Sequence, residues 1–327
     1  MSRSGTLLRS LLAVAGIVIA GAAVAPPVHA EDRVVLVSWD GIRRDVLHEL
    51  LEWQPLGETP KACPQARQAP VLPTECNGYL TCLPNLCNFQ IIDSNDVEGK
   101  PLTRPQHAQM LSGYGPAETG AITNAGVNSL PPGFTIYEHI HAMRPEVFNV
   151  HIAGRKYVGQ GIIRWAVESG ALDLDLRRGG RDNYTGENTT EKVVDALDAI
   201  GDQPFFMFLH YKAADVLAHR SGDRGEQYRE AIVQNDRQLG TVLGMLAARE
   251  LLPTTEVFVT TDHGFHGIFH VNADDPLIMR TWFASLRHNL DSSSEATILD
   301  VAPTVIETLG IPLSSASPSF RGRALVP

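Results

Sequence analysis

The chain has 327 residues, of which 43% are hydrophobic, and its 37 acidic residues outnumber its 27 basic ones, for a formal net charge of -10. This apolar fraction is ordinary for a globular protein and argues against disorder along the whole chain. The acidic balance disfavours binding to a nucleic-acid duplex through surface charge.

The first thirty residues have the features of a secretory signal peptide. Arg3 and Arg9 precede the apolar run LLAVAGIVIAGAAVA, and PPVHA then ends in a small residue before Glu31. Because this run is short for a membrane span, we expect a signal peptide at residues 1–30 that is cleaved. The mature chain is then exported, periplasmic or extracellular, with no stable membrane span. An uncleaved anchor is the alternative.

Strand-like apolar runs alternate with helical patterns along the rest of the chain. The strand-like runs are RVVLVSW, VFNVHIAG, PFFMFLHY and EVFVTT, and helical patterns cover DVLHELLEW, the segment after Gly225 and ATILDVAPTVIETLG. Runs that are apolar throughout suit the interior of a mostly parallel central sheet with helices on both faces. No Gly/Ser-rich or Pro-rich linker divides residues 31–327, so we predict a single large α/β domain.

Two regions interrupt this alternation. Residues 55–100 are rich in Pro, Cys and Asn and are predicted to form an insertion, and RRGGRDNYTGENTT at 177–190 is predicted to be a polar loop. The insertion contains all the cysteines of the chain, namely Cys63, Cys76, Cys82 and Cys87. Their spacing has no C-x-x-C pair and export favours oxidation, so we predict two local disulfides, with a zinc site as the alternative.

Carboxylates and histidines follow three of the strand-like runs. VVLVSWDG ends in Asp40, FFMFLHYKAAD leads to Asp215, and EVFVTTDHG contains Asp262 and His263. Ligands bind beyond the carboxyl ends of the strands in an open α/β sheet, so we expect these groups at one edge. His219 lies four residues after Asp215, which places both on one face of a helical turn. Such mixed oxygen and nitrogen donors suit Zn²⁺, with Mn²⁺ as the alternative.

Thr103 is the candidate nucleophile. The chain contains no G-x-S-x-G motif, which argues against a serine hydrolase of the α/β type. Thr103 stands two residues before Pro105, where a helix could begin, and a hydroxyl at a helix start benefits from the positive end of the helix dipole. The alternative is that Thr103 only caps that helix.

In chain order these segments resemble the alkaline phosphatase superfamily, and within it the type I phosphodiesterase and nucleotide pyrophosphatase branch. VVLVSWDGIRRDVL resembles the first metal-binding strand, and LTRPQHAQMLSGYGPAETGAITN resembles the nucleophile segment. ADVLAHRSG is similar to the D-x-x-G-H-x-x-G motif, and VTTDHGFHGIFH to the S/T-D-H-G motif with its distal histidine. ILDVAPTVIETLGIPL and FRGRALVP resemble the closing D-x-x-P-T helix and the G-x-x-L tail. Six such segments in the family order make the resemblance specific.

The resemblance implies an alkaline-phosphatase-like fold, two divalent metal ions and a covalent phosphothreonine on Thr103. Asn124 occupies the position whose side-chain amide donates a hydrogen bond to a phosphoryl oxygen. One metal would be held by Asp215, His219 and His270, and the other by Asp40, Asp262 and His263, with Thr103 bridging toward both. His266 is the alternative to His270, and the family spacing favours His270.

The chain departs from the family pattern at three places, and the second and third of these bear on the substrate. Ala218 stands where glycine is usual, Arg104 replaces a common aromatic residue, and the insertion lengthens the gap before Thr103. The sequence TRPQH at 103–107 lacks the C/S-x-P-x-R pattern of formylglycine sulfatases. The resemblance implies a phosphodiesterase or nucleotide pyrophosphatase acting on a small phosphate ester, and the missing pattern disfavours a formylglycine sulfatase. The alternatives are a phosphomonoesterase, a phosphonate hydrolase, a phosphotransferase or a non-catalytic exported binding protein.

Three further residues each have two interpretations. Asp236 lies on the buried stripe of the long helix after Gly225. It is either a structural hydrogen-bond acceptor, which the pairing of buried polar groups favours, or an anchor behind a metal ligand. Arg104 and His107 are candidates for substrate contact, and packing on the nucleophile helix is the alternative for His107.

Overall fold

The computed structural model describes residues 32–52, 83, 85–93, 95–125, 129–177, 186–291 and 295–326. The predicted signal peptide and the predicted disulfides fall on residues outside these ranges, because 1–30, Cys63, Cys76 and Cys82 are not among them. Within the described ranges, no helix combines the length and the apolar character that crossing a membrane requires.

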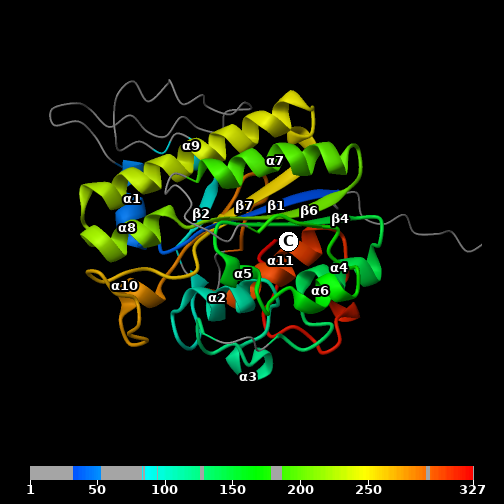
Figure 1. Cartoon of the computed structure of the whole chain (residues 1–327), viewed down its shortest axis with the longest axis horizontal. Coiled ribbons are helices and arrows are strands. Elements are labelled where there is room, and N and C mark those ends of the chain that lie inside the picture. Colours follow the sequence, from blue (N-terminus) through cyan, green and yellow to red (C-terminus); the bar gives the residue numbers. More distant parts are fainter. Residues whose placement is uncertain are drawn as a thin grey trace, which may run out of the picture.

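A seven-stranded sheet forms the centre of the fold (Figure 1). Its order is β2-β8-β7-β1-β6-β4-β5, and β7, β1, β6, β4 and β5 are parallel to one another. β8 pairs antiparallel with both β7 and β2 at one edge. The predicted mostly parallel sheet is therefore confirmed. The strands are β1 (Arg33–Trp39), β2 (Gln90–Ile92), β4 (Phe148–Ala153), β5 (Leu174–Asp175), β6 (Phe205–Tyr211), β7 (Thr255–Thr260) and β8 (Phe283–Ser285).

Helices cover both faces of this sheet, as predicted (Figure 1). One face is covered by α1 (Arg44–Glu52), α7 (Glu187–Ile200) and α9 (Glu226–Ala248), with α8 (Ala213–Ser221) at its edge. The other carries α2 (Thr103–Met110), α4 (Ile136–Met143), α5 (Lys156–Gly159), α6 (Arg164–Glu168) and α11 (Val301–Thr308). Short elements join them: α3 (Pro116–Thr119), α10 (Pro276–Met279), η2 (Leu86–Asn88), η3 (Leu252–Thr254), η4 (Ile298–Asp300) and η5 (Leu313–Ser315).

Alternation along the buried strands divides the core into two layers. Val35 and Val37 of β1 belong to the layer that packs against α7 and α9, whereas Val34 and Leu36 belong to the layer under α11. Successive side chains of a strand point to opposite faces, so a central strand covered on both faces is apolar at most consecutive positions, as from Val34 to Val37. This is why the run RVVLVSW predicted a parallel strand with helices on both sides.

Both regions predicted as irregular contain regular structure at their ends. The described part of 55–100 includes η2, β2 in the central sheet, and β3 (Asn95–Asp96), which pairs with β9 (Ala296–Thr297) in a separate two-stranded sheet. The polar segment 177–190 ends earlier than predicted, because α7 begins at Glu187 with Gly186 as its N-cap. Gly186 has a positive φ of 78°, a conformation that glycine adopts without steric cost.

Asp236 is a structural hydrogen-bond acceptor, the favoured interpretation. It is buried within α9, and its carboxylate accepts from the backbone N–H groups of Asn85 at 3.2 Å and of Leu86 at 2.7 Å. The side-chain amide of Asn85 donates to it as well, at 2.9 Å. Asp236 therefore attaches the start of η2 to the long helix.

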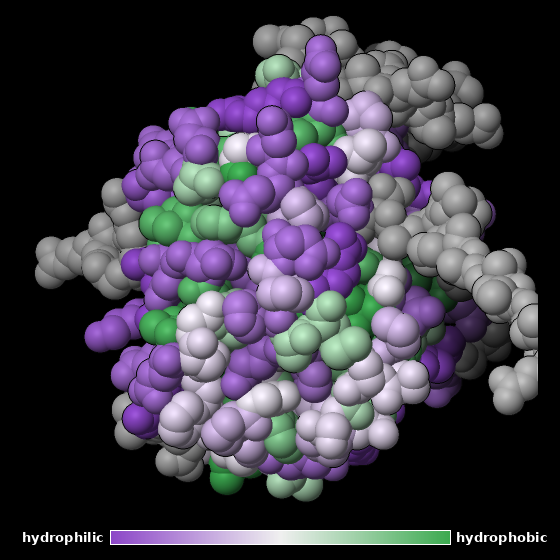
Figure 2. All heavy atoms as spheres, turned by 90° about the vertical axis from the view of Figure 1, so that its right-hand side faces the viewer, coloured by the Kyte–Doolittle hydropathy of each residue, from purple (hydrophilic) through white to green (hydrophobic). Residues whose placement is uncertain are grey.

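Figure 2 shows the face on the right-hand side of Figure 1, away from α1 and α8. Hydrophilic and hydrophobic residues are interspersed over the described part of this face. Scattered apolar side chains are normal on a solvated surface and do not mark a binding site. The chemistry predicted from the sequence lies instead at the α8 end of the sheet, where the parallel strands finish.

Candidate active site

Three neighbouring parallel strands end in a buried cluster of aspartates. Asp40 directly follows β1, Asp215 lies in the first turn of α8 after β6, and Asp262 follows β7. All three are fully buried. Backbone hydrogen bonds join them, since Asp215 N donates to Asp40 O at 3.1 Å and Gly41 N donates to Asp262 Oδ1 at 3.0 Å. The expectation that three strands direct carboxylates to one edge is confirmed.

Asp40, Asp262 and His263 form the first of two candidate metal groups, which we call the inner group. His263 Nε2 lies 3.6 Å from Asp40 Oδ1 and 3.3 Å from Asp262 Oδ2. Both carboxylate oxygens are buried and have no hydrogen-bond partner. The Nδ1–H of His263 donates to the carbonyl of Gly264 at 3.0 Å, which leaves the lone pair on Nε2 facing the carboxylates. Burial keeps the pKa of His263 well below its ordinary value, so the ring is neutral.

Asp215, His219 and His270 form the second candidate metal group, the outer group. Asp215 Oδ1 lies 3.5 Å from His219 Nε2 and 3.4 Å from His270 Nε2, and the two nitrogens are 3.1 Å apart. Each ring donates its Nδ1–H to a backbone carbonyl, His219 to Ile268 at 2.8 Å and His270 to Pro101 at 2.7 Å. Both Nε2 atoms therefore present lone pairs to each other, an arrangement that a shared cation stabilises.

The geometry of the outer group agrees with the expected helical-turn spacing of Asp215 and His219. It also agrees with the preference for His270 over His266. Asp215 and His219 occupy one face of α8, four residues apart. His266 lies elsewhere: its Nδ1 contacts Asp275 Oδ2 at 2.5 Å, and its side chain is 62% exposed. His270, rather than His266, reaches Asp215.

The electrostatics of the cluster favour added positive charge. Burial, together with the neighbouring Asp40, raises the pKa of Asp215 to about 7. Burial likewise raises the pKa of Asp262 well above its ordinary value. Burial also opposes ionisation of Asp40, but Arg155 and a hydrogen bond from His210 hold its pKa below the usual range. Unpartnered carboxylate oxygens beside neutral imidazole nitrogens are the donor set of a zinc site, so both groups fit divalent metal ions.

Arg155 is a member of this cluster that the sequence analysis missed. It lies two residues after β4, its side chain is 14% exposed, and it contacts Asp215 Oδ2 and lies 3.4 Å from Asp40 Oδ2. Its guanidinium therefore binds Oδ2 of Asp40 and of Asp215, whereas Oδ1 of each aspartate faces the histidines. The signal was present, because Arg155 follows the strand-like run VFNVHIAG just as Asp40 follows RVVLVSW.

Tyr157 lies beside Arg155. Its hydroxyl contacts the guanidinium of Arg155, and the nearby Thr103 side chain partly offsets the effect of burial on its pKa. Burial raises the pKa of Tyr157 to about 12, so the phenol keeps its proton. An arginine that donates to the phenol oxygen makes the phenol O–H a stronger donor.

Thr103 is the first residue of α2, as predicted, and it does not cap the helix. The N-cap is Leu102, which makes no side-chain capping hydrogen bond. The Thr103 hydroxyl is buried and lies 3.5 Å from His263 Nε2. The nucleophile candidate therefore lies against the inner metal group.

His107 and Arg104 pack around Thr103 within the protein. His107 is fully buried, donates from Nδ1 to the carbonyl of Thr103 at 2.7 Å, and has Ser38 Oγ 2.9 Å from its Nε2. The Arg104 guanidinium donates to the carbonyls of Gln160 at 3.3 Å and Thr123 at 3.2 Å. Packing, the alternative interpretation of His107, is therefore the one that its contacts support.

Asn124 lies beside the nucleophile. Its Oδ1 accepts a hydrogen bond from the backbone N–H of Arg104 at 2.8 Å, which orients the side chain at the start of α2. With the amide oxygen used in this way, the amide NH₂ is the group that can donate to a substrate oxygen.

The profile of the type I phosphodiesterase / nucleotide pyrophosphatase family matches residues 136–307, more than half of the chain. The chain belongs to this family. The resemblance to this branch of the alkaline phosphatase superfamily is thereby confirmed. The match includes Asp215, His219, Asp262, His263 and His270, whereas Asp40, Thr103 and Asn124 precede it. Family membership indicates a hydrolase.

Solved structures share the fold at low sequence identity. A protein solved with its substrate D-glucosamine-2-N,6-O-disulfate is 13% identical with a TM-score of 0.62, over 90% of this chain and 79% of that one. A putative sulfatase from Bacteroides thetaiotaomicron is 14% identical with a TM-score of 0.60, over 90% and 74%. The lipoteichoic acid synthase LtaP from Listeria monocytogenes is 15% identical with a TM-score of 0.55, over 91% and 74%. No curated protein matches in sequence.

Proposed function

We propose that this family member is an exported two-metal hydrolase of small phosphate esters, acting as a phosphodiesterase or nucleotide pyrophosphatase with Thr103 as nucleophile. The observation that carries the proposal is the position of the buried Thr103 hydroxyl, 3.5 Å from His263 and at the start of a helix. A hydroxyl has little packing reason to lie beside two groups of unpaired metal-ligating atoms. Family membership supports the hydrolytic chemistry.

Two divalent ions, with Zn²⁺ the first choice for these donors, would be held by the inner and outer groups. When bound, they would supply Lewis acidity toward the phosphoryl oxygens and lower the pKa of coordinated hydroxyl groups. The unpartnered oxygens of Asp40, Asp215 and Asp262 support this assignment, because buried carboxylates are otherwise paired.

The chain's own residues would carry out the displacement as follows. Thr103 Oγ1 loses its proton to solvent and attacks phosphorus, forming an O–P bond as the bond to the leaving alcohol or phosphate breaks, and the leaving oxygen takes up a proton from solvent. The amide of Asn124 donates to a phosphoryl oxygen. Water then cleaves the phosphothreonine and releases phosphate or its monoester.

Arg155 would act as a positioning residue in this scheme. Its guanidinium joins Asp40 of the inner group to Asp215 of the outer group through their second oxygens. Because a planar guanidinium holds two carboxylates in a defined geometry, it fixes the spacing of the two ligand sets. It also neutralises part of the negative charge that three aspartates bring into a buried site.

The test compares Thr103→Ala and Thr103→Ser with wild-type protein, all metal-replete, on an aryl phosphodiester. Thr103→Ala is expected to lower kcat by about 10³-fold or more, because removing one of several catalytic groups that act as a unit loses most of their joint effect. Thr103→Ser keeps a hydroxyl and should retain measurable turnover. Wild-type turnover by Thr103→Ala would show that another group attacks phosphorus.

A substrate panel decides among the esters that the same site could accept. It contains p-nitrophenyl phosphomonoesters, phosphodiesters, phosphonates and sulfates, and we expect diesters to be hydrolysed fastest. Sulfates are included because a putative sulfatase shares the fold. Absence of metal-dependent hydrolysis of every member would contradict the enzyme proposal and favour a binding protein.

A further inference from the structure

A buried ion pair between Arg43 and Asp223 lies beside the metal groups but is not used in the proposed reaction. Arg43 follows Asp40 of the inner group by three residues, and Asp223 follows His219 of the outer group by four. The two side chains are 4% and 5% exposed, and a guanidinium nitrogen of Arg43 contacts Oδ2 of Asp223. The pair therefore joins the segment after β1 to the connection between α8 and α9.

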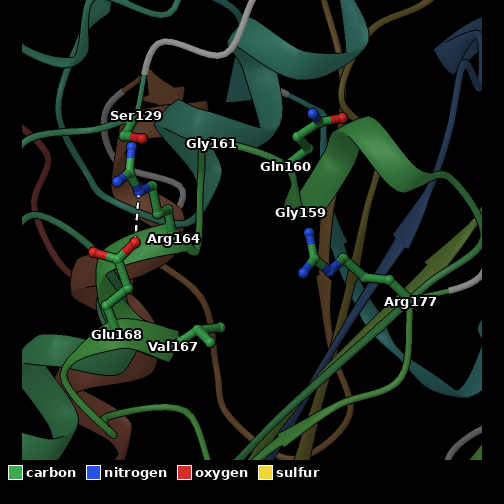
Figure 3. Close-up of a pocket in the computed structure, with 8 residues that line it drawn as sticks. All are labelled: Ser129, Gly159, Gln160, Gly161, Arg164, Val167, Glu168 and Arg177. Carbon is green, nitrogen blue, oxygen red and sulfur yellow. Dashed lines mark hydrogen bonds and ion pairs between the residues drawn. The ribbon is translucent and has the colours of Figure 1, made fainter.

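Figure 3 shows an ion pair of the opposite kind, at a pocket beside α6. Arg164 and Glu168 are four residues apart on that helix, and their side chains are 56% and 45% exposed. Such a pair contributes little and connects no separate elements. Burying two charges, as in Arg43 and Asp223, costs desolvation energy, so a buried pair adds little net stability. A planar guanidinium does, however, fix the relative position of the groups that it joins.

Arg43 has a fixed position at the end of β1. Its backbone N–H donates to the hydroxyl of the buried Tyr228 at 2.8 Å, and that hydroxyl donates to the carbonyl of Gly41 at 2.8 Å. The N–H of Gly41 donates to Asp262 of the inner group at 3.0 Å. The guanidinium also donates to both carboxylate oxygens of Asp45, at 2.9 and 2.6 Å. Arg43 is therefore held in place relative to the inner group.

Asp223 holds the turn that precedes His270. Its backbone N–H donates to the carbonyl of Gly267 at 2.9 Å. The next carbonyl of the turn, that of Ile268, accepts from Nδ1 of His219 at 2.8 Å. The same turn therefore orients one histidine of the outer group through a hydrogen bond and leads directly into the other.

Apolar burial contributes little to the position of this turn, because residues 266–269 are all exposed. The turn is closed by hydrogen bonds between the backbones of His266 and Phe269, at 2.9 and 3.3 Å. His266 also contacts Asp275, but its side chain is 62% exposed. Hydrogen bonds therefore set the place of the turn, and the one from Asp223 is the one attached to a buried charge.

We propose that Arg43 is a positioning residue for the outer metal group, acting through Asp223 on the turn at residues 266–269. The ion pair fixes the turn relative to the end of β1, and the turn directs the Nε2 atoms of His219 and His270 toward each other. This inference rests on the proposed function in one respect, namely that the outer group binds a metal ion. Arg43 itself contacts neither the ion nor the substrate.

Titration of the zinc-loaded full chain with a chromophoric chelator measures the two zinc affinities. His270→Ala identifies which of the two steps belongs to the outer group. Arg43→Met should weaken the outer affinity about tenfold, because contacts behind a metal ligand commonly contribute that much, and should leave the inner affinity unchanged. Excess zinc should then restore the kcat of Arg43→Met, since the variant keeps every proposed ligand.

Two further variants sharpen the test. Asp223→Asn keeps the backbone N–H and the size of the side chain, so it should reproduce the outer loss through the ion pair alone. The double variant Arg43→Met/Asp223→Asn should lose no more than either single variant, because the two residues act as one unit. Arg224→Met is the matched control: it removes a half-exposed arginine that pairs with the same Asp45, and it should keep both affinities.

An unchanged outer affinity in Arg43→Met or Asp223→Asn overturns the inference, and so does an equal loss at both sites, which a merely structural role would produce. A kcat that stays low with both sites filled also overturns it. The proposed function fails separately. A wild type that binds two zinc ions but hydrolyses no ester contradicts the hydrolase, and the zinc affinities of the variants still decide the role of Arg43.

Discussion

The inner and outer metal groups have the same donor chemistry but are built from different parts of the fold. The inner group stands at the ends of β1 and β7 and is completely buried. The outer group combines α8 with the loop after β7, and the side chain of His219 is 42% exposed. Residues beside His270 are also exposed, Phe269 at 61% and Val271 at 65%. Ligands held by central strands are positioned by the core, whereas ligands on a helix and a loop depend on local contacts.

The two groups also differ in the contacts that hold each histidine in place. His219 and His270 each rely on one backbone carbonyl, from Ile268 and Pro101, to set the tautomer and the ring orientation. In the inner group, the backbone at Gly41 also donates to Asp262. We therefore expect the inner group to bind metal more tightly and to exchange it more slowly.

His263→Ala is expected to have the largest effect, a loss of about 10³-fold in kcat/KM, because it removes a proposed inner ligand that lies 3.5 Å from the Thr103 hydroxyl. His270→Ala should lose outer metal with a smaller loss in kcat/KM. His266→Ala is the matched control and should stay within about twofold, since exposed ion pairs contribute little. Metal analysis and steady-state kinetics check the three variants. A metal-deficient His266→Ala would reverse the assignment of the distal ligand.

Chelation should remove the two metals in order. The outer ion is expected to leave first, because a chelator can reach the exposed His219 ring. A time course of metal content during dialysis against a chelator should show two phases, with about half of the metal lost in the first. Simultaneous loss of both ions would contradict the expected difference in metal binding between the inner and outer groups.

Arg155→Met should destabilise the metal-free protein by about 3 kcal/mol, because breaking a largely buried ion pair leaves Asp40 and Asp215 without a counter-charge. Bound metals would replace part of that charge, so the loss should be smaller in the metal-loaded protein. Urea unfolding of both forms measures the difference. Arg164→Met, which removes an exposed pair with Glu168, is the control and should cost less than about 1 kcal/mol. Equal losses with and without metal would contradict a role for Arg155 between the groups.

Asp236→Ala should lower the free energy of unfolding by about 2 kcal/mol, because it leaves the N–H groups of Asn85 and Leu86 without their acceptor. Turnover per metal-loaded molecule should not change, since Asp236 contacts neither metal group. Asp198→Ala, at an exposed pair with Arg249, is the control and should cost about 0.5 kcal/mol or less. A loss of turnover without a loss of stability would indicate that Asp236 anchors a residue behind a metal ligand instead.

A further expected effect is a pH dependence of stability from Glu256, on the opposite end of β7 from the metal groups. Burial raises the pKa of Glu256 to about 7, while hydrogen bonds from Ser285 and Leu286 oppose the rise. A carboxyl whose pKa is higher in the folded state binds protons more readily there, so stability falls as pH rises from the unfolded pKa toward 7. Glu256→Gln should lose less stability than wild type between about pH 5 and pH 8 in urea unfolding. If the free energy of unfolding changed equally with pH in both proteins, Glu256 would not be the source of the pH dependence.

Much of the site could be predicted from the sequence because its signals are local. A run such as VVLV within β1 is apolar over consecutive positions when both faces of the strand are covered, and the residue that follows the strand then lies at the functional edge. The D-x-x-x-H spacing of Asp215 and His219 likewise depends on one helical turn. The start of α2 at Thr103 followed from Pro105 nearby.

Other features depended on segments that are distant in sequence. The described end of the 55–100 region joins the central sheet through β2, because Gln90–Ile92 can pair with β8, a strand almost two hundred residues away. The membership of Arg155 in the cluster depends on β4 lying beside β6, which brings a cation next to Asp215. Sequence spacing carries no information about such a pairing.

The sequence by itself determined the kind of chemistry: strand-end aspartates and histidines, a threonine at a helix start, and the order of segments that identified the family. The tertiary structure decided which atoms meet. His270 is preferred over His266 because the carbonyl of Pro101 orients its ring toward Asp215, and Thr103 faces His263 because the start of α2 lies against the segment that follows β7. Local residue patterns specify backbone periodicity, whereas the direction of a ligand atom is set by the packing and hydrogen bonds of its neighbours.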